Sequence, residues 1–235
     1  MLALLLLACM APTARGMALP SRRRLLLRTL GGGAAAVAAA PAVAYPNAVP
    51  QAAQYADRKK RRGPAPTDLG VASRGGSDSE DPELKLCGAA PNCFSTTPDS
   101  FSDEHAIPTW TPPAKASRAA AVEDVAAAIA GYAPGQSGVD GGGFEVQGKA
   151  TGGGYFYVRY ESLKNGYIDD VEFAVGDAAP FPVRVRSASR VGYLDYEVNA
   201  KRLNALSAEL RARGWAAPEI TAKTHPGYFA QNAAR

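Results

Sequence analysis

The sequence is poor in the residues that bind metals or serve as catalytic bases. Its 235 residues include three cysteines and two histidines, and Cys9 lies in an N-terminal segment that we expect to be removed. The two other cysteines cannot complete a zinc site by themselves. No histidine stands beside Ser187 or Ser189, the serines of the most polar stretch, so no general base is assigned. We predict no metal, no cofactor and no catalytic residue, and we favour a protein that is not an enzyme.

A long hydrophobic run is missing as well. Leu2–Met10 is shorter than the roughly 20 apolar residues that span a bilayer, and it is typical of the core of a secretory signal. Ser21–Leu27 resembles a twin-arginine motif, and the Gly/Ala-rich run after it ends in Ala42-Val43-Ala44, a small-residue cleavage site. Two signals in this order suit an alga whose plastid is reached through the secretory pathway. We expect residues 1–44 to direct the chain to the thylakoid lumen and to be cleaved, which leaves no transmembrane segment; a bacterial periplasmic protein is the alternative.

Acidic residues are absent from residues 1–44, and this changes the meaning of the net charge. The full chain has 26 basic and 22 acidic residues and a net charge of +4. Without the five arginines of that segment, 21 basic and 22 acidic residues remain, a net charge of −1. The charge of the remaining chain gives no reason to expect nucleic-acid binding.

Residues 45–86 are predicted to form an extended or disordered arm, because five prolines interrupt them and they have little to bury. The arm contains five consecutive basic residues, which we call the basic run: Arg58, Lys59, Lys60, Arg61 and Arg62. The chain after the run has 16 basic and 21 acidic residues, a net charge of −5. A basic arm on an acidic body favours docking to an anionic lipid surface or an acidic protein face. A solvated run in a linker, or an arm that folds back on its own domain, is the alternative.

Cys87 and Cys93 are close in the sequence. In an oxidising compartment such a pair favours a small-loop disulfide, which fixes local shape more than global stability. Metal ligation and a redox-active pair are the alternatives, although the spacing is not the C-x-x-C of thioredoxin-like enzymes. The cluster Asp103-Glu104-His105 is a weak candidate for chemistry, because adjacent side chains do not converge on one point.

A globular domain is expected over residues 87–216, with a loop-rich entry over 87–113 and an irregular tail over 217–235. Apolar residues at helical spacing predict one helix from Ser117 to Tyr132 and another from about Tyr196 to Arg213, and residues 136–143 read as a flexible glycine-rich connection. Alternating residues predict four strands between the helices, at 144–147, 155–161, 167–174 and 183–186. The fold class is therefore α+β: helix, four-stranded antiparallel meander, helix, with both helices on one face of the sheet and long irregular N- and C-terminal arms.

The other face of this sheet would carry tyrosines and charged residues. They are Tyr155, Tyr157, Arg159, Asp170, Glu172, Arg184 and Arg186. Because Tyr and Arg are enriched at protein interfaces, we predict that the basic run and Tyr155, Tyr157 and Arg159 bind a partner. A solvated face with paired charges is the alternative.

A set of polar motifs resembles a known family. It comprises Cys87 with Pro91-Asn92-Cys93 and Ser95, then Asp103 and His105, then Asp169–Phe173, and then Arg186–Gly192 continued by Asp195, Asn199 and Arg202. Between about Leu86 and Trp215 the chain resembles the domain of unknown function 1499 family, found in bacteria and plastids. It departs from the family pattern at Glu197, where glycine is usual. The resemblance implies a small α+β domain and no activity.

Polar residues of these motifs form the candidate site. We assign nine of them to a structural or anion-binding network: Asp170, Glu172, Arg186, Ser187, Ser189, Arg190, Asp195, Asn199 and Arg202. Arg and Ser groups at a helix start can hold an anion, whereas a structural network would fix the fourth strand to the following helix.

The targeting signals and the arms favour a non-catalytic thylakoid-lumen protein. We expect it to bind a photosystem (photosystem I or II) or another thylakoid membrane complex as an accessory subunit or assembly factor, with a possible peripheral membrane contact. One alternative is a lumenal small-molecule or anion-binding or enzymatic domain that uses the Ser189–Asp195 turn. Another is a redox-sensitive assembly factor that uses Cys87 and Cys93.

Overall fold

A computed structural model of the chain describes residues 45–73, 81–98, 104–147 and 153–233. All of these lie in one compact unit. The predicted targeting segment, residues 1–44, and Asp103 of the acid–histidine cluster lie outside the described residues. Within the described ranges, no helix combines the length and the hydrophobicity needed to cross a membrane.

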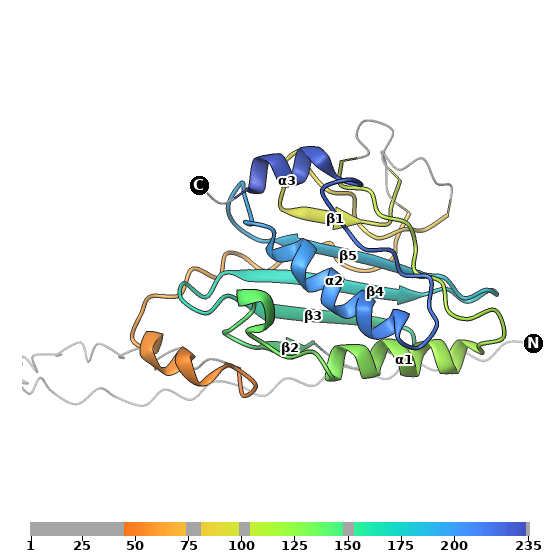
Figure 1. The fold of residues 1–235 in the computed structure, drawn as a ribbon, viewed down its shortest axis with the longest axis horizontal. Coiled ribbons are helices and arrows are strands. Elements are labelled where there is room, and N and C mark those ends of the chain that lie inside the picture. The colour runs from red at the N-terminus through yellow and green to blue at the C-terminus, as the bar shows by residue number, and fades with distance from the viewer. Residues whose placement is uncertain (1–44, 74–80, 99–103, 148–152, 234–235) are drawn as a thin grey trace, which may run out of the picture. The chain divides into compact units, whose positions relative to one another are not determined.

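The centre of the domain is an antiparallel sheet of five strands in the order β1-β5-β4-β3-β2 (Figure 1). Three longer strands make up most of it: β3 (Tyr155–Glu161), β4 (Ile168–Val175) and β5 (Val183–Ser189). The three-residue strands β2 (Phe144–Val146) and β1 (Cys93–Ser95) form its edges. Because successive side chains of a strand point to opposite faces, Val171 and Phe173 of β4 enter the hydrophobic core while Asp170 and Glu172 point away from it.

The α+β class and the antiparallel sheet are confirmed, but the four-stranded meander is wrong because β1 adds a fifth strand. β1 precedes the first helix in the sequence and pairs with β5, with Phe94 opposite Ser187. Three residues are too few to show an alternating pattern, and the surrounding segment is rich in proline. The burial of Phe94, which is 0% exposed, joins this segment to the core.

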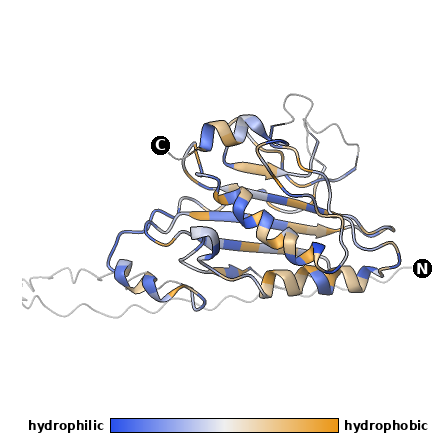
Figure 2. Ribbon diagram, in the orientation of Figure 1, coloured by the Kyte–Doolittle hydropathy of each residue, from blue (hydrophilic) through white to orange (hydrophobic). Residues whose placement is uncertain are grey.

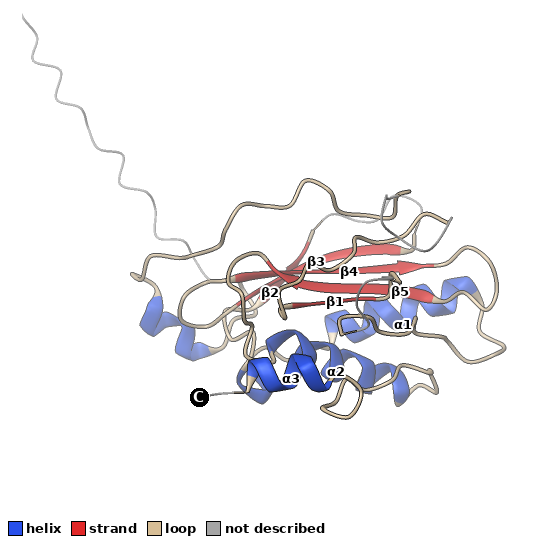
Figure 3. Cartoon of the chain, turned by 90° about the horizontal axis from the view of Figure 1, so that it is seen from above, coloured by secondary structure: helices blue, strands red, loops and turns tan. Residues whose placement is uncertain are grey.

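Two helices pack on one face of the sheet (Figure 3). They are α1 (Arg118–Ala130), which is largely hydrophobic along its length (Figure 2), and α2 (Val198–Arg211). Ser117 caps α1, since its hydroxyl accepts the N–H of Ala120 at 3.1 Å. Leu203, Leu206 and Leu210 of α2 join the core cluster with the apolar residues of the central strands.

The sequence predicts an irregular C-terminal segment. The structure differs, because this segment contains a third helix. α3 (Pro226–Asn232) places Tyr228 against Phe94, with ring centroids 4.5 Å apart. It lies next to β1 in Figure 1. The expectation of an irregular tail is therefore wrong for these residues, which are helical and place Tyr228 completely buried.

The N-terminal segment covers the polar face of the sheet (Figure 3). After the short 3-10 helix η1 (Pro50–Tyr55), residues 60–72, which we call the strap, cross this face. Residues 83–86 return beside the strap and pair with it through the bridge between Ala72 and Glu83. Asp170 and Glu172 are consequently 3% and 0% exposed. The polar face is therefore covered and not open, and of the alternatives given for the arm the structure shows residues 60–72 folded back on their own domain.

The glycine-rich loop before β2 receives the start of the arm. The N–H groups of Tyr45 and Val49 donate to the carbonyls of Gly142 (3.3 Å) and Gly141 (3.0 Å). A Cβ on Gly142 would lie 2.8 Å from the carbonyl oxygen of Glu161, so a larger residue does not fit there. The short 3-10 helix η2 (Gln136–Gly138) begins the same loop. The loop is thus a docking surface for residues 45–49 rather than the flexible connection that its composition indicated.

Candidate functional site

The sheet divides the nine candidate network residues between two separate groups. Ser187 of β5 is hydrogen-bonded to α2, whereas Arg186, its neighbour, pairs with Glu172 on the strap side. The strap-side group is Asp170, Glu172, Arg186 and Arg190, and the helix-side group is Ser187, Ser189, Asp195, Asn199 and Arg202. A single network is therefore wrong, because alternation along β5 sends its residues to opposite faces.

Asp195 organises the helix-side group. Its carboxylate accepts hydrogen bonds from the N–H groups of Glu197 (3.1 Å) and Asn199 (2.9 Å). It also accepts from the side-chain amide of Asn199 (2.7 Å) and from the hydroxyl of Tyr228 (2.8 Å). Burial raises the pKa of Asp195, and these donors oppose that rise. Burial also raises the pKa of Tyr228, which therefore keeps its proton and acts as a donor. Asp195 caps the start of α2 and binds it to α3.

Arg202 is a fully buried cation that joins four parts of the chain. Its guanidinium donates to Asp140 in the loop before β2 and to Asp169 of β4 at 2.7 Å. It also donates to the oxygens of Ser187 (3.2 Å) and Asn199 (2.9 Å). Burial raises the pKa of Asp140, and the charge of Arg202 opposes this. A buried cation with this many partners holds α2 in register with β4 and β5.

The two candidate serines are both hydrogen-bonded to the side-chain amide of Asn199, which is not a base. Ser187 Oγ donates to Asn199 Oδ1 at 2.5 Å, and Ser189 Oγ accepts from Asn199 Nδ2 at 3.1 Å. A serine nucleophile needs a general base within hydrogen-bonding distance. The helix-side group therefore joins β5 to α2, and its arrangement is that of a structural network.

The strap-side group pairs its charges within itself and with the strap. Arg190 donates two hydrogen bonds to Asp170, both of 2.8 Å, and a third to the hydroxyl of Tyr157 at 3.0 Å. The hydroxyl of Tyr155 and the N–H of Gly70 in the strap both donate to Glu172, at 2.8 and 2.6 Å. Charge-assisted hydrogen bonds are among the stronger ones in proteins. The bond from Gly70 to the buried carboxylate of Glu172 therefore holds the strap on the sheet.

A cavity of about 390 Å³ remains between the strap and the sheet. Four candidate residues contribute to its wall, together with the strap residues 64–68 and Lys85: Asp170, Arg186, Ser189 and Arg190. Its lining includes the cations of Lys85, Arg186 and Arg190 and the carboxylates of Asp68 and Asp170, of which Lys85 pairs with Asp68 at 2.6 Å and Arg190 with Asp170 at 2.8 Å. Its size is in the range of small-molecule sites, and its lining suits a small polar or anionic molecule.

The basic run is divided between the interior and the surface. Lys60 and Arg62 form ion pairs of 3.1 and 2.8 Å with Glu161, whose side chain is 0% exposed. Arg58, Lys59 and Arg61 are exposed. The predicted partner-binding residues of the sheet are also engaged internally: Tyr155 and Tyr157 donate to Glu172 and Asp170, and Arg159 pairs with Glu145.

A turn between β5 and α2 displays two tyrosines. We call residues 190–197 the tyrosine turn. Tyr193 and Tyr196 are 61% and 62% exposed. Tyr196 and Glu197 have φ angles of 57° and 66°, in the left-handed region that costs L-residues energy. Glu197 is the position where the sequence resemblance led us to expect glycine, and its left-handed backbone is one that glycine adopts without steric cost.

The tyrosine turn and the exposed cations of the basic run lie at the same end of the sheet, at the left of Figure 1. The N–H of Arg190 donates to the carbonyl of Ile168, where β4 begins, at 3.0 Å. The N–H of Arg61 donates to Asn165, in the hairpin before β4, at 2.8 Å. We call this part of the surface the hairpin end; it comprises residues 57–63, 162–167 and 190–197.

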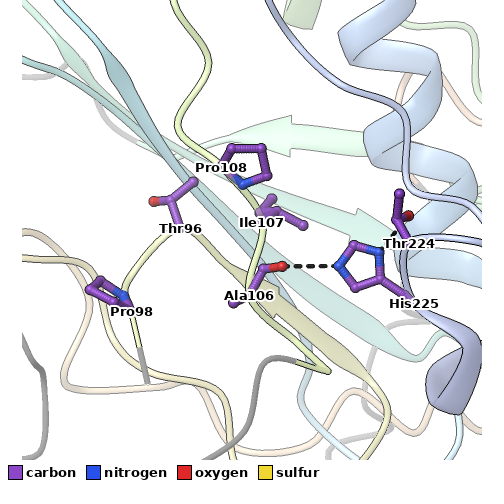
Figure 4. A pocket seen from close by; sticks show the side chains of 7 residues that line it. All are labelled: Thr96, Pro98, Ala106, Ile107, Pro108, Thr224 and His225. Carbon is purple, nitrogen blue, oxygen red and sulfur yellow. Dashed lines mark hydrogen bonds between the residues drawn. The ribbon is translucent and has the colours of Figure 1, made fainter. Parts of the chain in front are cut away.

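The two histidines lie apart from both groups of candidate residues. His105 Nδ1 lies 3.2 Å from the carbonyl of Cys93. His225 lies between the carbonyl of Ala106 (2.9 Å) and the hydroxyl of Thr224 (2.8 Å), beside a cavity of about 460 Å³ (Figure 4). In the described parts of the chain, no three His, Cys, Asp or Glu side chains are placed to hold a metal ion.

The predicted disulfide is confirmed: Cys87 and Cys93 are bonded to each other. The bond closes the loop immediately before β1. Because β1 pairs with β5, the disulfide lies close to the strand that leads into the tyrosine turn.

The fold and these contacts define a small α+β domain whose distinctive polar residues are mostly buried and hydrogen-bonded. The chain belongs to the family described as "Protein of unknown function (DUF1499)", which matches residues 83–210. The matched range includes all five strands, both candidate groups and most of α2, and the strap precedes it. Comparison with curated proteins and with solved structures gave no significant match.

Sequence reasoning missed several residues that complete the site. Asp140, Tyr228 and Asn232 all make buried hydrogen bonds to the candidate residues or to the turn. The Asp-Gly pair at 140–141 is a turn signal, and Asp140 has a positive φ of 57°. Tyr228 and Asn232 are four residues apart after a proline, a spacing that indicates one face of a short helix.

Proposed function

We propose that the protein is a non-catalytic protein of the thylakoid lumen that binds a photosystem or another thylakoid membrane complex as an accessory subunit or assembly factor. Its main support is the hairpin end. Two tyrosines that are more than 60% exposed lie at the same end of the sheet as exposed cations of the basic run. The two targeting signals in series support the location.

The tyrosine turn has the properties of a preformed binding surface. Asn232 Oδ1 accepts the N–H groups of Asp195 (3.0 Å) and Tyr196 (2.9 Å), so the backbone below the tyrosines is held by buried side chains. Tyrosine supplies a large contact area with few rotatable bonds, and a rigid backbone lowers the entropy lost on binding. Strained backbone held in place by its surroundings is a reason to look for function at that position.

The chemistry of the hairpin end favours an acidic partner face. Arg58, Lys59, Arg61 and Lys164 are exposed at the hairpin end, where Asp57 is the one exposed acid; Glu197 is partly exposed and pairs with Lys201. Such cations accelerate encounter with an acidic surface and make binding sensitive to salt. The two tyrosines, which a bound partner would bury, would then supply most of the binding energy.

Fractionation of gently solubilised thylakoids tests this proposal. We expect the wild-type chain to co-migrate with one membrane complex at low salt and to be released at high salt. The double variant Tyr193→Ser, Tyr196→Asn should migrate free, since asparagine tolerates the left-handed backbone. The matched control is Val146→Ser, which replaces an apolar residue that is 45% exposed on the edge strand β2. It should bind like wild type. Equal binding by the tyrosine variant, or a wild-type chain that is free at low salt, would refute the proposal.

A second candidate, binding of a small anion, is favoured by the cavity under the strap. Inorganic phosphate and small carboxylates such as acetate and succinate are the probes. Binding would raise the thermal unfolding temperature of the full chain progressively, with the logarithm of the ligand concentration once this exceeds the dissociation constant. Lys85→Met, at the cavity wall, should remove that rise, and Lys115→Met, on an exposed residue elsewhere, should keep it. An unfolding temperature that does not move with either probe class excludes this candidate.

A further inference from the structure

The disulfide loop, residues 87–93, is hydrogen-bonded directly to the tyrosine turn. The side-chain amide of Asn92 donates to the carbonyl of Gly192 at 2.7 Å. The carbonyl of Asn92 accepts the N–H of Ser189 at 3.0 Å and the side-chain amide of Asn199 at 2.9 Å. One short loop therefore holds both the end of β5 and the middle of the turn.

A second connection runs through α3. The carbonyl of Pro91 accepts a hydrogen bond from Asn232 Nδ2 at 2.7 Å. The oxygen of the same Asn232 side chain accepts the N–H groups of Asp195 and Tyr196. Asn232 is 1% exposed, so these bonds are shielded from water. The disulfide loop, together with the carbonyl of Tyr228 in α3, thus holds Asn232 and, through it, Tyr196.

We propose that the Cys87–Cys93 disulfide is a thiol–disulfide exchange site, and that its reduction by a dithiol partner releases the tyrosine turn. Gly88 and Ala89 are exposed, and the disulfide is the covalent link that closes the loop; within it the N–H of Asn92 donates to the carbonyl of Ala90 at 2.8 Å. The flanking chain stays attached, since Ser95 Oγ and Thr97 Oγ1 donate to the carbonyls of Lys85 and Leu84. Opening of the disulfide therefore loosens the loop and the turn while the sheet remains folded.

The exchange reaction has a preferred point of attack. Cys93 is 3% exposed and Cys87 is partly exposed, so a thiolate of the reductant reaches Cys87 Sγ. The Sγ–Sγ bond breaks as a mixed disulfide forms at Cys87, and Cys93 leaves as a thiolate that takes up a proton. The second thiol of the reductant then displaces Cys87, which also becomes a thiol. The reductant is oxidised by two electrons to its own disulfide.

Amide hydrogen exchange of the full chain, oxidised and after complete reduction by dithiothreitol, tests the coupling. Titration of free thiols verifies reduction. We expect the amides of Ser189, Asp195 and Tyr196 to exchange at least tenfold faster in the reduced protein, because their acceptors lie on or next to the loop. Amides of β3 and β4 should be unchanged. Equal exchange of the turn in both states, or equal acceleration in β3 and β4, would overturn the proposal.

Two variants keep the test specific. Asn232→Ala removes the acceptor of the Asp195 and Tyr196 N–H groups while the disulfide stays intact, so these two amides should already exchange fast in the oxidised protein and gain little on reduction. The matched control is Asn204→Ala in the same helix as Asn199, because Asn204 binds the chain at Ile220 and not the disulfide loop. It should keep the full tenfold response. A lost response in Asn204→Ala, or a full response of the Asp195 and Tyr196 amides in Asn232→Ala, would contradict the assigned route.

The regulatory consequence rests on the proposed function, and its failure is distinguishable from failure of the coupling. If the turn responds to reduction, binding to thylakoid membranes should fall at least tenfold in the reduced protein. Binding that is equal in both redox states would overturn the regulatory role while leaving the proposed function intact. A turn that responds in a protein that binds no membrane complex in either state would support the exchange site and refute the proposed function.

Discussion

The ion pairs of the strap with Glu161 give the most quantitative prediction. Glu161 is 0% exposed and is neutralised by Lys60 and Arg62, and Arg62 donates hydrogen bonds of 3.0 and 2.8 Å to it. The double variant Lys60→Met, Arg62→Met leaves this carboxylate buried without a cation. Breaking a buried ion pair from one side costs about 3–5 kcal/mol. We expect the free energy of unfolding to fall by that amount.

Urea denaturation of the full chain measures this loss. Fluorescence of Trp110 and Trp215 reports it, since the two residues are 2% and 4% exposed. The matched control is Arg58→Met, Lys59→Met, which removes the same charge from exposed positions of the same basic run. Surface changes of this kind typically stay within about 0.5 kcal/mol.

A third variant separates lost charge from lost packing. Adding Glu161→Met to the double variant removes the uncompensated carboxylate, and apolar replacement of a whole buried ion pair is often nearly neutral. We expect it to recover most of the lost stability. A double variant within about 0.5 kcal/mol of the control, or a third substitution that recovers nothing, would refute the account of the strap as an integral part of the domain.

Three further predictions concern the tyrosine turn and its supports. Glu197→Gly should raise the free energy of unfolding by up to about 1 kcal/mol in urea denaturation, because relief of the left-handed backbone exceeds the entropy that glycine adds to the unfolded chain; a loss of stability would contradict this. Tyr228→Phe should cost about 1–3 kcal/mol, because buried Asp195 loses a donor, and no change in the urea midpoint would count against that bond. Burial raises the folded-state pKa of Asp195 above its ordinary 3.8, so folded Asp195 binds its proton more tightly than the unfolded chain does. As the pH falls from the folded-state pKa to the unfolded-state pKa of 3.8, the wild-type protein should therefore become more stable relative to Asp195→Asn. A relative gain by the variant instead would show that the hydrogen-bond donors lower the pKa of Asp195 more than burial raises it.

Local pattern was sufficient to predict the central part of the fold. Alternation in Asp170–Phe173 and helical spacing of Leu203, Leu206 and Leu210 indicated the sheet and α2, since each pattern is set by the period of its element. β1 and α3 escaped because each is short and is stabilised by distant contacts: β1 pairs with β5, and Tyr228 of α3 packs on Phe94 and donates to Asp195. Such contacts leave no periodic signal in the sequence.

The candidate site was predicted as a list of residues but not as an arrangement. Membership in the family directed attention to Arg186, Ser187 and Asp195, and all three are held in polar contacts. Their division between two faces follows from the strand period, but it required the register of β5. The strap was unpredictable from charge alone, because Lys60 and Arg62 are indistinguishable in sequence from their exposed neighbours.

Binding of the chain to thylakoid membranes is the measurement that tests the central claim most directly. Wild type and the Tyr193→Ser, Tyr196→Asn variant would be compared on density gradients of gently solubilised thylakoids, at low and high salt. We predict that the wild-type chain co-migrates with one membrane complex, that high salt releases it, and that the variant remains free although it is folded. A folded wild-type chain that migrates free of every complex at low salt would contradict the claim and would favour the cavity under the strap as the functional site.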